Sequence, residues 1–429
     1  MIRIGTPRRV VVTGIGAVTP IGTGVEGLWE GLRARRSAVG PVTRFDPTPF
    51  RSRIAAEIPD FRPRDFMGEK EARRLDRFTQ LSLAGARLAL ADARLDPARE
   101  DRERIGVMMG TALGGVAMAE AQHSAYLAEG LRAVEPALAF TVFAGAASCS
   151  IAVAFGCQGP NSTNGMSCAS GAIAVGEGLR AIRDGHADVM LAGGVEAPLA
   201  PLSFGAFAII RAMSTRNDDP GGASRPFDAA RDGFVMGEGV ATLVLEERGR
   251  ALARGAPVYA EVLGYGLTND AHHMTAPRPD GSQAARAVRL ALADAGVEPA
   301  AVGYVNAHGS STPLNDPTEN RAIRTVFGDH ADRLQLSGTK GYYGHALGAS
   351  GAIEAAICAL AAARGWVPPT LNLAEPDPAC DLPWLAGEGA AAHPGVLVSN
   401  SFGFGGVNAA LVLAAPGAGD DLRPGARRS

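Results

Sequence analysis

The sequence lacks the features that mark disulfide-rich, membrane or nucleic-acid-binding proteins. Its five cysteines are odd in number and include no CxxC pair, so we expect neither a disulfide framework nor a metal site. This cysteine usage is typical of a reduced, cytoplasmic protein. No segment reaches the roughly 18 uninterrupted apolar residues of a membrane span, and we expect no signal peptide. The chain has 41 Lys and Arg and 44 Asp and Glu, so it lacks the excess of basic residues that is typical of a nucleic-acid-binding protein.

Histidine and aromatic residues are scarce, whereas glycine is abundant. The chain has eight histidines and 6% aromatic residues, but 55 glycines in 429 residues, well above the usual ~7%. We therefore expect many tight turns and close backbone approaches. Hydrophobic residues make up 46% and charged residues 20%, as in a globular protein with a large core. The length favours two domains or two fused halves.

Strand-like runs alternate with helix-like runs, which predicts an α/β fold. Residues 75–95 have apolar side chains at helical spacing. The strand candidates are short apolar or β-branched runs at 10–13, 105–109, 188–191, 241–245, 258–263, 302–306 and 409–413.

A four-residue segment occurs twice in the chain. Ser170-Gly171-Ala172-Ile173 recurs as Ser350-Gly351-Ala352-Ile353, each time after a glycine-rich turn and before a helical pattern. Together with the length, the repeat predicts two similar halves, 1–255 and 256–415. A coincidence between two helix starts is the alternative interpretation. The remainder, 416–429, is rich in Gly, Pro, Asp and Arg and is predicted to be a disordered tail.

Cys168 is the cysteine with the most suggestive surroundings. It lies among small residues, and an amphipathic helix is predicted to begin directly after it. At a helix N-terminus, free N–H groups and the helix dipole favour a thiolate, so we expect a lowered thiol pKa and a usable nucleophile. The same N–H groups are suited to half of an oxyanion hole. A buried structural cysteine is the alternative.

Two histidines stand apart from the other six. His308 follows the strand candidate 302–306, and strand ends are where α/β proteins build their sites. His345 lies between Gly344 and Gly348, in a segment where the backbone can approach a ligand closely. Either histidine alone fits a loop residue bonded to backbone. Their occurrence together with Cys168, each in a Gly- or Ser-rich segment, favours a Cys-His-His constellation.

Motifs along nearly the whole chain carry a family resemblance. They are Arg9-Val10-Val11-Val12-Thr13-Gly14-Ile15-Gly16, Ser224-Arg225-Pro226-Phe227-Asp228, Arg231-Asp232-Gly233-Phe234-Val235 and Asn400-Ser401-Phe402-Gly403-Phe404-Gly405-Gly406-Val407-Asn408, with the three segments above. The chain resembles the β-ketoacyl-acyl-carrier-protein synthases of the synthase II type and the related ketosynthases of polyketide assembly. The resemblance implies a thiolase-like five-layer α-β-α-β-α sandwich, built from two duplicated halves and found as a homodimer.

The resemblance also implies a chemistry, a decarboxylative Claisen condensation. Cys168 would hold the acyl chain as a thioester, and His308 and His345 would act in the decarboxylation of malonyl-acyl carrier protein. The resulting carbanion would attack the thioester to give 3-oxoacyl-acyl carrier protein, as in fatty-acid elongation. Lys340 and Glu354 match residues that support the histidines, and Phe404 matches a gatekeeper whose N–H completes the oxyanion hole.

Substrate contacts follow from the same resemblance. Leu113 and Phe207 fall where the acyl pocket is gated and lined. Thr275, Ser310 and Thr312 fall where hydroxyls contact the phosphopantetheine arm. The basic residues matched to carrier-protein docking are Lys70, Arg73, Arg74 and Arg211; an ordinary solvated helix face is the alternative. The resemblance implies an acyl carrier protein as partner and no resident cofactor, since 4'-phosphopantetheine arrives on the carrier, and it implies no metal, nucleic acid or membrane.

The chain departs from the family pattern at several positions. The departures are Met166-Ser167 before the cysteine, Ala169 after it, Ser310 after Gly309, Gly341-Tyr342-Tyr343 after Lys340, and the segment 139–154. No reacting atom is lost, but the acyl-chain preference stays open. A ketosynthase of a polyketide or other specialised lipid pathway is therefore an alternative, and in a polyketide pathway it would form a heterodimer with a ketosynthase-like partner. A non-catalytic chain-length-factor-like partner is disfavoured by Cys168. A thiolase or synthase III-type enzyme, suggested by Asn400, is disfavoured by the two histidines.

Overall fold

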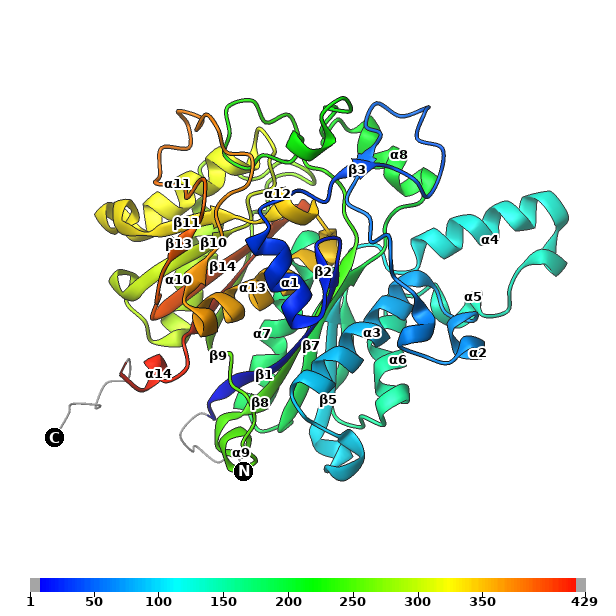
Figure 1. Cartoon of the computed structure of the whole chain (residues 1–429), viewed down its shortest axis with the longest axis horizontal. Helices are drawn as coiled ribbons and strands as arrows, with labels where there is room; N and C mark the ends of the chain where they lie inside the picture. Colours follow the sequence, from blue (N-terminus) through cyan, green and yellow to red (C-terminus); the bar gives the residue numbers. More distant parts are fainter. Residues whose placement is uncertain (1–7, 422–429) are drawn as a thin grey trace.

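The computed structural model describes residues 8–421 and contains one large mixed sheet of eleven strands (Figure 1). These strands are β1 (Val10–Thr19), β2 (Gly22–Thr23), β5 (Ile105–Gly110), β6 (Asn161–Asn164), β7 (Val189–Glu196), β8 (Gly239–Glu247), β9 (Ala260–Asn269), β10 (Val302–Ala307), β11 (Gln335–Gly338), β14 (Val396–Gly403) and β15 (Val407–Ala414). Two short pairs lie outside it, β3 (Gly40–Pro41) with β4 (Ile54–Ala55) and β12 (Trp366–Val367) with β13 (Ala390–Ala391). All seven predicted strands are present, most of them longer than predicted.

The sheet consists of two halves with the same topology. The first half runs β6-β5-β7-β8-β1 and the second β11-β10-β14-β15-β9, so both have the chain order third, second, fourth, fifth, first. In both, the fifth strand is antiparallel to its two neighbours and the other pairs are parallel. The halves join where 10–12 of β1 pair with 260–262 of β9. The duplication suggested by the sequence repeat is therefore confirmed, whereas the boundaries at 255 and 415 stay predictions.

The two halves of the sheet form two β layers, and helices form the three layers outside and between them. The outer helices of the first half are α3 (Arg77–Asp92) and α6 (Ala146–Phe155), the central pair is α7 (Ser170–Arg183) and α13 (Ser350–Arg364), and the outer helices of the second half are α10 (Ser282–Ala295) and α11 (Asn315–Phe327). The other α-helices are α1 (Gly24–Arg33), α2 (Glu69–Ala72), α4 (Val116–Glu129), α5 (Leu138–Thr141), α8 (Pro201–Ile209), α9 (Arg248–Ala253), α12 (Lys340–Tyr343) and α14 (Ala418–Asp421). The arrangement is the predicted α-β-α-β-α sandwich.

The central helix α13 is buried on nearly every side, and Glu354 is its only charged residue before Arg364. The window Leu347–Arg364 is long and apolar enough to cross a membrane by composition, but 89% of it is buried within the structure. It is a core helix, enclosed by α7 and the two halves of the sheet.

Part of the predicted disordered tail is ordered. Residues 418–421 form α14, and the Asp420 carboxylate accepts hydrogen bonds from Arg9 and, at 3.1 Å, from Arg248. Ion pairs to the start of β1 and of α9 thus hold this segment against the sheet, and the prediction of disorder is wrong there. Residues 422–429 lie outside the described residues.

The repeated segment lies where the two central helices meet. A Cβ placed on Gly171 would come within 2.7 Å of the Ala352 nitrogen, and a Cβ on Gly351 within 2.7 Å of the Ala172 nitrogen. The two contacts are reciprocal, as expected of duplicated halves related by a pseudo-twofold. Only glycine lets the two backbones approach this closely.

Gly351→Ala should destabilise the protein, because the added methyl group meets the nitrogen and Cβ of Ala172 and the hydroxyl of Ser401, none of which is the end of a long flexible side chain. We expect a loss of about 1–3 kcal/mol in the free energy of unfolding, measured by urea titration. Gly395→Ala is the control, since nothing lies within 4 Å of a Cβ there. Equal stability of the two variants would contradict this account of the helix contact.

Candidate functional site

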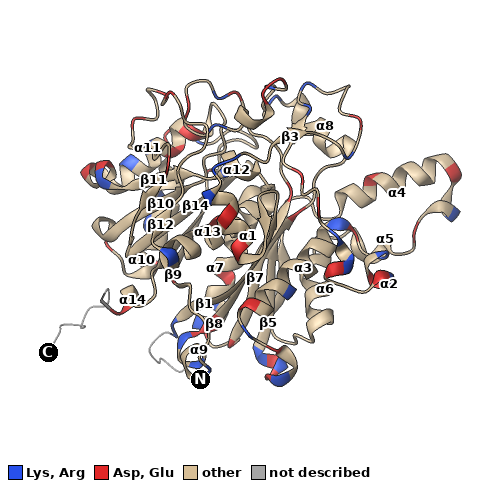
Figure 2. Ribbon diagram, in the orientation of Figure 1, with Lys and Arg blue, Asp and Glu red and all other residues tan. Residues whose placement is uncertain are grey.

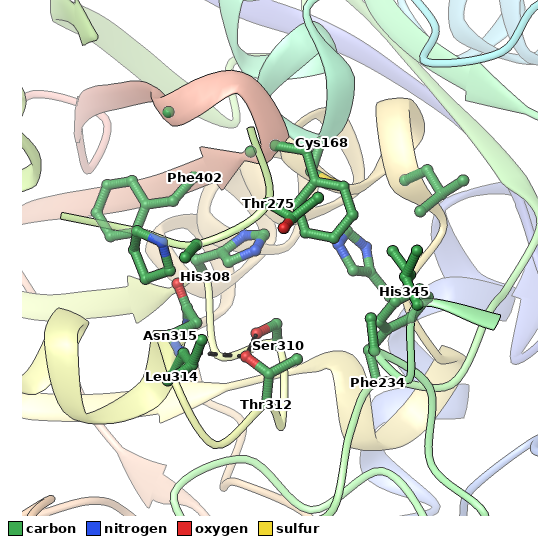
Figure 3. Close-up of a pocket in the computed structure, with 18 of the residues that line it drawn as sticks. Cys168, Phe234, Thr275, His308, Ser310, Thr312, Leu314, Asn315, His345 and Phe402 are labelled. Atoms are coloured by element: carbon green, nitrogen blue, oxygen red, sulfur yellow. Dashed lines mark hydrogen bonds between the residues drawn. The ribbon is translucent and has the colours of Figure 1, made fainter. Parts of the chain in front are cut away.

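A cavity of about 290 Å³ brings the three predicted catalytic residues together. Cys168 lies in the 3-10 turn η5 (Ser167–Ala169) between β6 and α7, and His308 directly follows β10. His345 lies between α12 and the 3-10 turn η9 (Leu347–Ala349). The side chains converge on one space although they come from both halves of the molecule (Figure 3).

The turn that presents Cys168 has a strained backbone. Ser167 has a φ of +53°, a left-handed conformation that is uncommon for a residue with a side chain. The Ser170 hydroxyl holds the turn by hydrogen bonds to the carbonyl oxygens of Ser167 (2.7 Å) and Thr111 (3.1 Å). The second half repeats the turn before α13, where Leu347 has a φ of +38°. In that copy Gly348 occupies the position of the thiol.

The Cys168 side chain is 7% exposed, and its neighbours are mostly apolar. The Phe404 N–H donates a hydrogen bond to the sulfur, and the Ser167 hydroxyl lies 3.7 Å from it. Gly403 passes so close that a Cβ there would lie 3.1 Å from the Cys168 nitrogen. The N–H groups of Cys168 and Phe404 therefore belong to adjoining backbone segments.

The predicted lowering of the thiol pKa is wrong for this site. Cys168 does lie at the start of a helix, but burial raises its pKa above the ordinary value. The Ser167 hydroxyl, the Lys340 ammonium and the Phe404 N–H act in the opposite direction without cancelling the burial. The sequence shows the helix start but not how completely the fold encloses the sulfur.

The two histidines form a closely packed pair. Their ring centroids lie 5.3 Å apart at an interplanar angle of 78°. His345 Nδ1 lies 2.9 Å from the Ser350 hydroxyl, and the ring of Phe234 packs edge-on against the same imidazole. Burial and the charge of Lys340 lower the pKa of both imidazoles well below the usual range. Both are therefore neutral near pH 7 and able to donate one N–H each.

Lys340 and Glu354 lie beneath the histidines and do not line the cavity. Both are fully buried and form an ion pair, and the Lys340 ammonium also donates to the His308 carbonyl oxygen. Lys340 Nζ lies 3.4 Å from His308 Nδ1. Because an ammonium only donates, Nδ1 accepts and Nε2 keeps the proton. Burial raises the pKa of Glu354 to about 7, against the lowering effect of Lys340.

Sequence reasoning missed a second buried carboxylate at the histidines. Glu319, on α11, accepts the backbone N–H groups of His308 and Gly309, each at 2.8 Å. Asn400 also donates to it, at 3.2 Å. Burial raises the pKa of Glu319 to about 7. Glu319 stands in a polar segment, Asn315-Asp316-Pro317-Thr318-Glu319-Asn320, whose composition is that of a solvated helix start. Only the packing of α11 in the structure therefore shows that the carboxylate is buried at the histidines.

The predicted substrate contacts divide into two groups. Phe207, Thr275, Ser310 and Thr312 line the cavity, and the hydroxyls of the last two lie 2.9 Å apart. Leu113 does not line it and instead packs into the apolar cluster that contains Cys168. Three hydroxyls thus line the cavity together with members of the apolar cluster, among them Phe234 and Leu347, while Leu113 packs into that cluster outside the cavity lining.

The four basic residues border two different hollows. Arg211 lines the cavity, whereas Lys70, Arg73 and Arg74 surround a separate surface depression together with Glu69. The latter group lies on and next to α2 (Figure 2), and Arg73 forms an ion pair with Glu69. The docking role of these four residues stays a prediction.

Of the residues that depart from the family pattern, Ser310 lines the cavity, whereas Met166, Tyr342 and Tyr343 do not. Met166 is exposed at 51%, and Tyr342 and Tyr343 are fully buried in the core. The Tyr343 hydroxyl lies 2.8 Å from Thr339 Oγ1. Across residues 8–421, no group of three or more His, Cys, Asp or Glu side chains is placed to hold a metal ion.

A buried thiol and two neutral imidazoles, at the junction of two duplicated α/β halves, define a condensing enzyme with the thiolase fold. Comparison with known families agrees. Residues 7–251 match the N-terminal domain of beta-ketoacyl synthases, and residues 259–374 match the C-terminal domain. The chain belongs to the beta-ketoacyl synthase family.

Known relatives cover almost the whole chain. A 3-oxoacyl-[acyl-carrier-protein] synthase 2 from Synechocystis sp. is 47% identical, over 95% of this chain and 98% of its own. The ishigamide ketosynthase/chain length factor is 39% identical, with a TM-score of 0.90 over 95% of this chain and 99% of its own. A type II polyketide ketosynthase, bound to its acyl-carrier protein and a hexaketide, is 35% identical with a TM-score of 0.87 over the same shares.

The raised pKa of Cys168 has a measurable consequence. Below its pKa the sulfur is a thiol, so its alkylation by iodoacetamide should be slow near pH 7 and still rise above pH ~8.5, the ordinary cysteine value. Peptide mass spectrometry across a pH series measures this rate at Cys168 separately from the exposed Cys149. A rate that levels off below pH 8 would contradict the raised pKa.

Proposed function

We propose that the protein catalyses the decarboxylative Claisen condensation of an acyl thioester with malonyl-acyl carrier protein, giving 3-oxoacyl-acyl carrier protein in fatty-acid elongation. The observation that carries the proposal is the meeting of one thiol and two neutral imidazoles in one cavity. Family membership and the name of the relative from Synechocystis sp. support the same reaction.

The first step is transfer of the acyl group to Cys168. The sulfur attacks the thioester carbonyl of the acyl carrier, and the carrier thiol leaves with a proton. Because Cys168 enters as a thiol and the carrier sulfur leaves as a thiolate, the proton lost by the first is taken up by the second, and the step balances. The N–H groups of Cys168 and Phe404 are placed to stabilise the tetrahedral oxyanion.

The second step is decarboxylation of the malonyl thioester. Loss of CO2 leaves an electron pair on the α-carbon, delocalised onto the thioester oxygen as an enolate. His308 and His345 each donate one N–H toward that oxygen, because both are neutral and each has one ring nitrogen occupied by Lys340 or Ser350. The α-carbon then attacks the acyl thioester, and the sulfur of Cys168 leaves and is reprotonated.

Lys340, Glu354 and Glu319 serve this step as supports. The ammonium fixes the His308 tautomer, and Glu354 balances its charge in a site without water contact. Glu319 holds the backbone of His308 and Gly309 through two N–H bonds. Burial, together with the charge of Lys340, lowers the pKa of both imidazoles and thereby keeps them neutral.

Two variants should separate the two steps. We expect Cys168→Ala to form no acyl-enzyme and no condensation product, while it still releases CO2 from malonyl-acyl carrier protein. His345→Ala should still form the acyl-enzyme, but its decarboxylation should fall by about 10²- to 10³-fold because one enolate donor is lost. Radiolabelled malonyl- and acyl-carrier proteins of several chain lengths measure CO2 release, acyl-enzyme and product.

His186→Ala serves as the matched control, since His186 is exposed and does not line the cavity. An acyl-enzyme in Cys168→Ala would rule out Cys168 as the nucleophile. A folded wild-type protein that condenses no acyl carrier of any length would overturn the proposed function.

A ketosynthase of polyketide or specialised lipid synthesis is the second candidate. It is favoured by the two ketosynthases of similar structure, which are less identical to this chain than the fatty-acid relative. The reaction steps are the same, so the product distribution in the assay above distinguishes the two. Repeated extension without reduction would favour the polyketide function.

We propose an acyl carrier protein as the substrate-bearing partner, no resident cofactor, and a cytoplasmic location. The phosphopantetheine arm would enter past Thr275, Ser310 and Thr312, and Arg211 at the same cavity would meet the acidic carrier. The basic residues near α2 offer a second positive surface.

We further propose that the chain pairs with a second copy through a protruding arm, residues 116–143, which includes α4 and α5. The helix α4 buries none of its own residues, and the arm exposes Tyr126, Leu127, Leu131, Phe140 and Phe143 (Figure 1). The neighbouring strand β6 forms a free edge of the sheet. An exposed apolar surface beside an open edge is typical of an interface.

Light scattering after gel filtration should give twice the chain mass of 44.1 kDa. Leu127→Glu combined with Leu131→Glu should give a folded monomer, because both side chains are exposed on the arm. Leu252→Glu is the control, as Leu252 is exposed on α9. A wild-type monomer, or a dimer unaffected by the arm variant, would contradict the proposed pairing.

A further inference from the structure

Glu196, the last residue of β7, is a fully buried carboxylate that no ion pair within residues 8–421 neutralises. Hydrogen bonds satisfy it instead. Its donors are Ala112 N (2.6 Å), Gly348 N (2.9 Å), the Thr111 hydroxyl (3.0 Å) and Leu113 N (3.1 Å). Each carboxylate oxygen accepts two of the four, which is the arrangement that a buried carboxylate needs.

These donors belong to different parts of the site. Residues 111–113 form the turn after β5 that carries Leu113 into the apolar cluster that contains Cys168. Gly348 belongs to η9 in the other half, three residues after His345. One carboxylate therefore ties the acyl side of the site to the histidine side across the junction of the halves.

Glu196 is also linked to the strained turn of the nucleophile. The Thr111 hydroxyl donates to Glu196, while the Thr111 carbonyl oxygen accepts the Ser170 hydroxyl, which also bonds Ser167. The chain of contacts thus ends at the residue directly before Cys168. Its charge acts on the sulfur too, and it opposes the effect of Lys340 there.

We propose that Glu196 is a positioning residue that holds the Leu113 turn and the Cys168 turn in place and thereby limits the length of chain that Cys168 can accept. An amide in its place would accept through one oxygen only and would direct its NH2 group at N–H donors. The Leu113 turn would then lose part of its anchoring. That Cys168 accepts an acyl chain rests on the proposed function, but the length limit can be tested with neither a carrier protein nor condensation.

The probes are iodoacetamides with linear alkyl tails, from short to long, which react with Cys168 itself. Glu196→Gln should relax the length cut-off, so that a tail excluded by the wild type reacts at least about threefold faster. It should also lower the pH midpoint of Cys168 alkylation by about half a unit or more, since a negative charge near the thiol is removed. Lys340, His308 and His345, the other titratable groups at the sulfur, are unchanged.

Thr111→Val separates position from charge. It removes the hydroxyl donor but keeps the carboxylate, so the length cut-off should relax while the pH midpoint stays at the wild-type value. The control is Glu246→Gln, an equally buried carboxylate on β8 that pairs with Arg250 and Arg254 away from the cavity. It should change neither readout.

A folded Glu196→Gln protein that keeps the wild-type length cut-off, or whose midpoint fails to fall, overturns the inference. If circular dichroism shows that this variant is unfolded, Thr111→Val decides, and an unchanged cut-off there overturns it. Relaxed alkylation in an enzyme that makes no 3-oxoacyl product would overturn the proposed function and leave the positioning role in place.

Discussion

The site depends on the close contact between the N-termini of the two central helices. Gly171 and Gly351 each face the backbone of the other helix, at a distance that a side chain would prevent. Because α7 begins just after Cys168 and α13 just after His345, this contact brings both turns to one cavity. The duplicated topology makes the meeting symmetric, and the departure from symmetry, a cysteine in one turn and a glycine in the other, gives the site its single nucleophile.

The electrostatic character of the site follows from its burial. The site holds the Lys340 ammonium, which pairs with Glu354, and three fully buried carboxylates, Glu196, Glu319 and Glu354. Burial raises the pKa of each carboxylate to about 7. Burial, together with the same ammonium, keeps both imidazoles neutral. These groups are suited to donate and pass single protons rather than to hold a stable charge, as a reaction through a transient enolate requires.

Much of the fold and part of the site could be predicted from the sequence. Residue pattern placed the seven strands and the helix after Cys168, and glycine-rich surroundings singled out His308 and His345. Glu319 and Glu196 were not predicted as site residues, because each is an ordinary acidic residue along the chain. Only packing makes each of them a buried acceptor of backbone N–H groups. The sequence also did not predict that Arg211 and the residues near α2 border different hollows, because a pattern of charges along the chain does not tell how far apart they lie in space.

The sequence by itself determined the chemistry available to this protein: which thiol, which imidazoles and which lysine exist, and that the chain is a duplicated α/β protein. These follow from residue identity and local periodicity, which act over a few positions. Tertiary structure alone decided that the thiol is enclosed, so that its pKa rises where a helix start would lower it. It also decided that Leu113 packs into the apolar cluster that contains Cys168 and that Glu196 joins the two halves. Burial and long-range contacts depend on segments far apart in the chain, and no local pattern contains them.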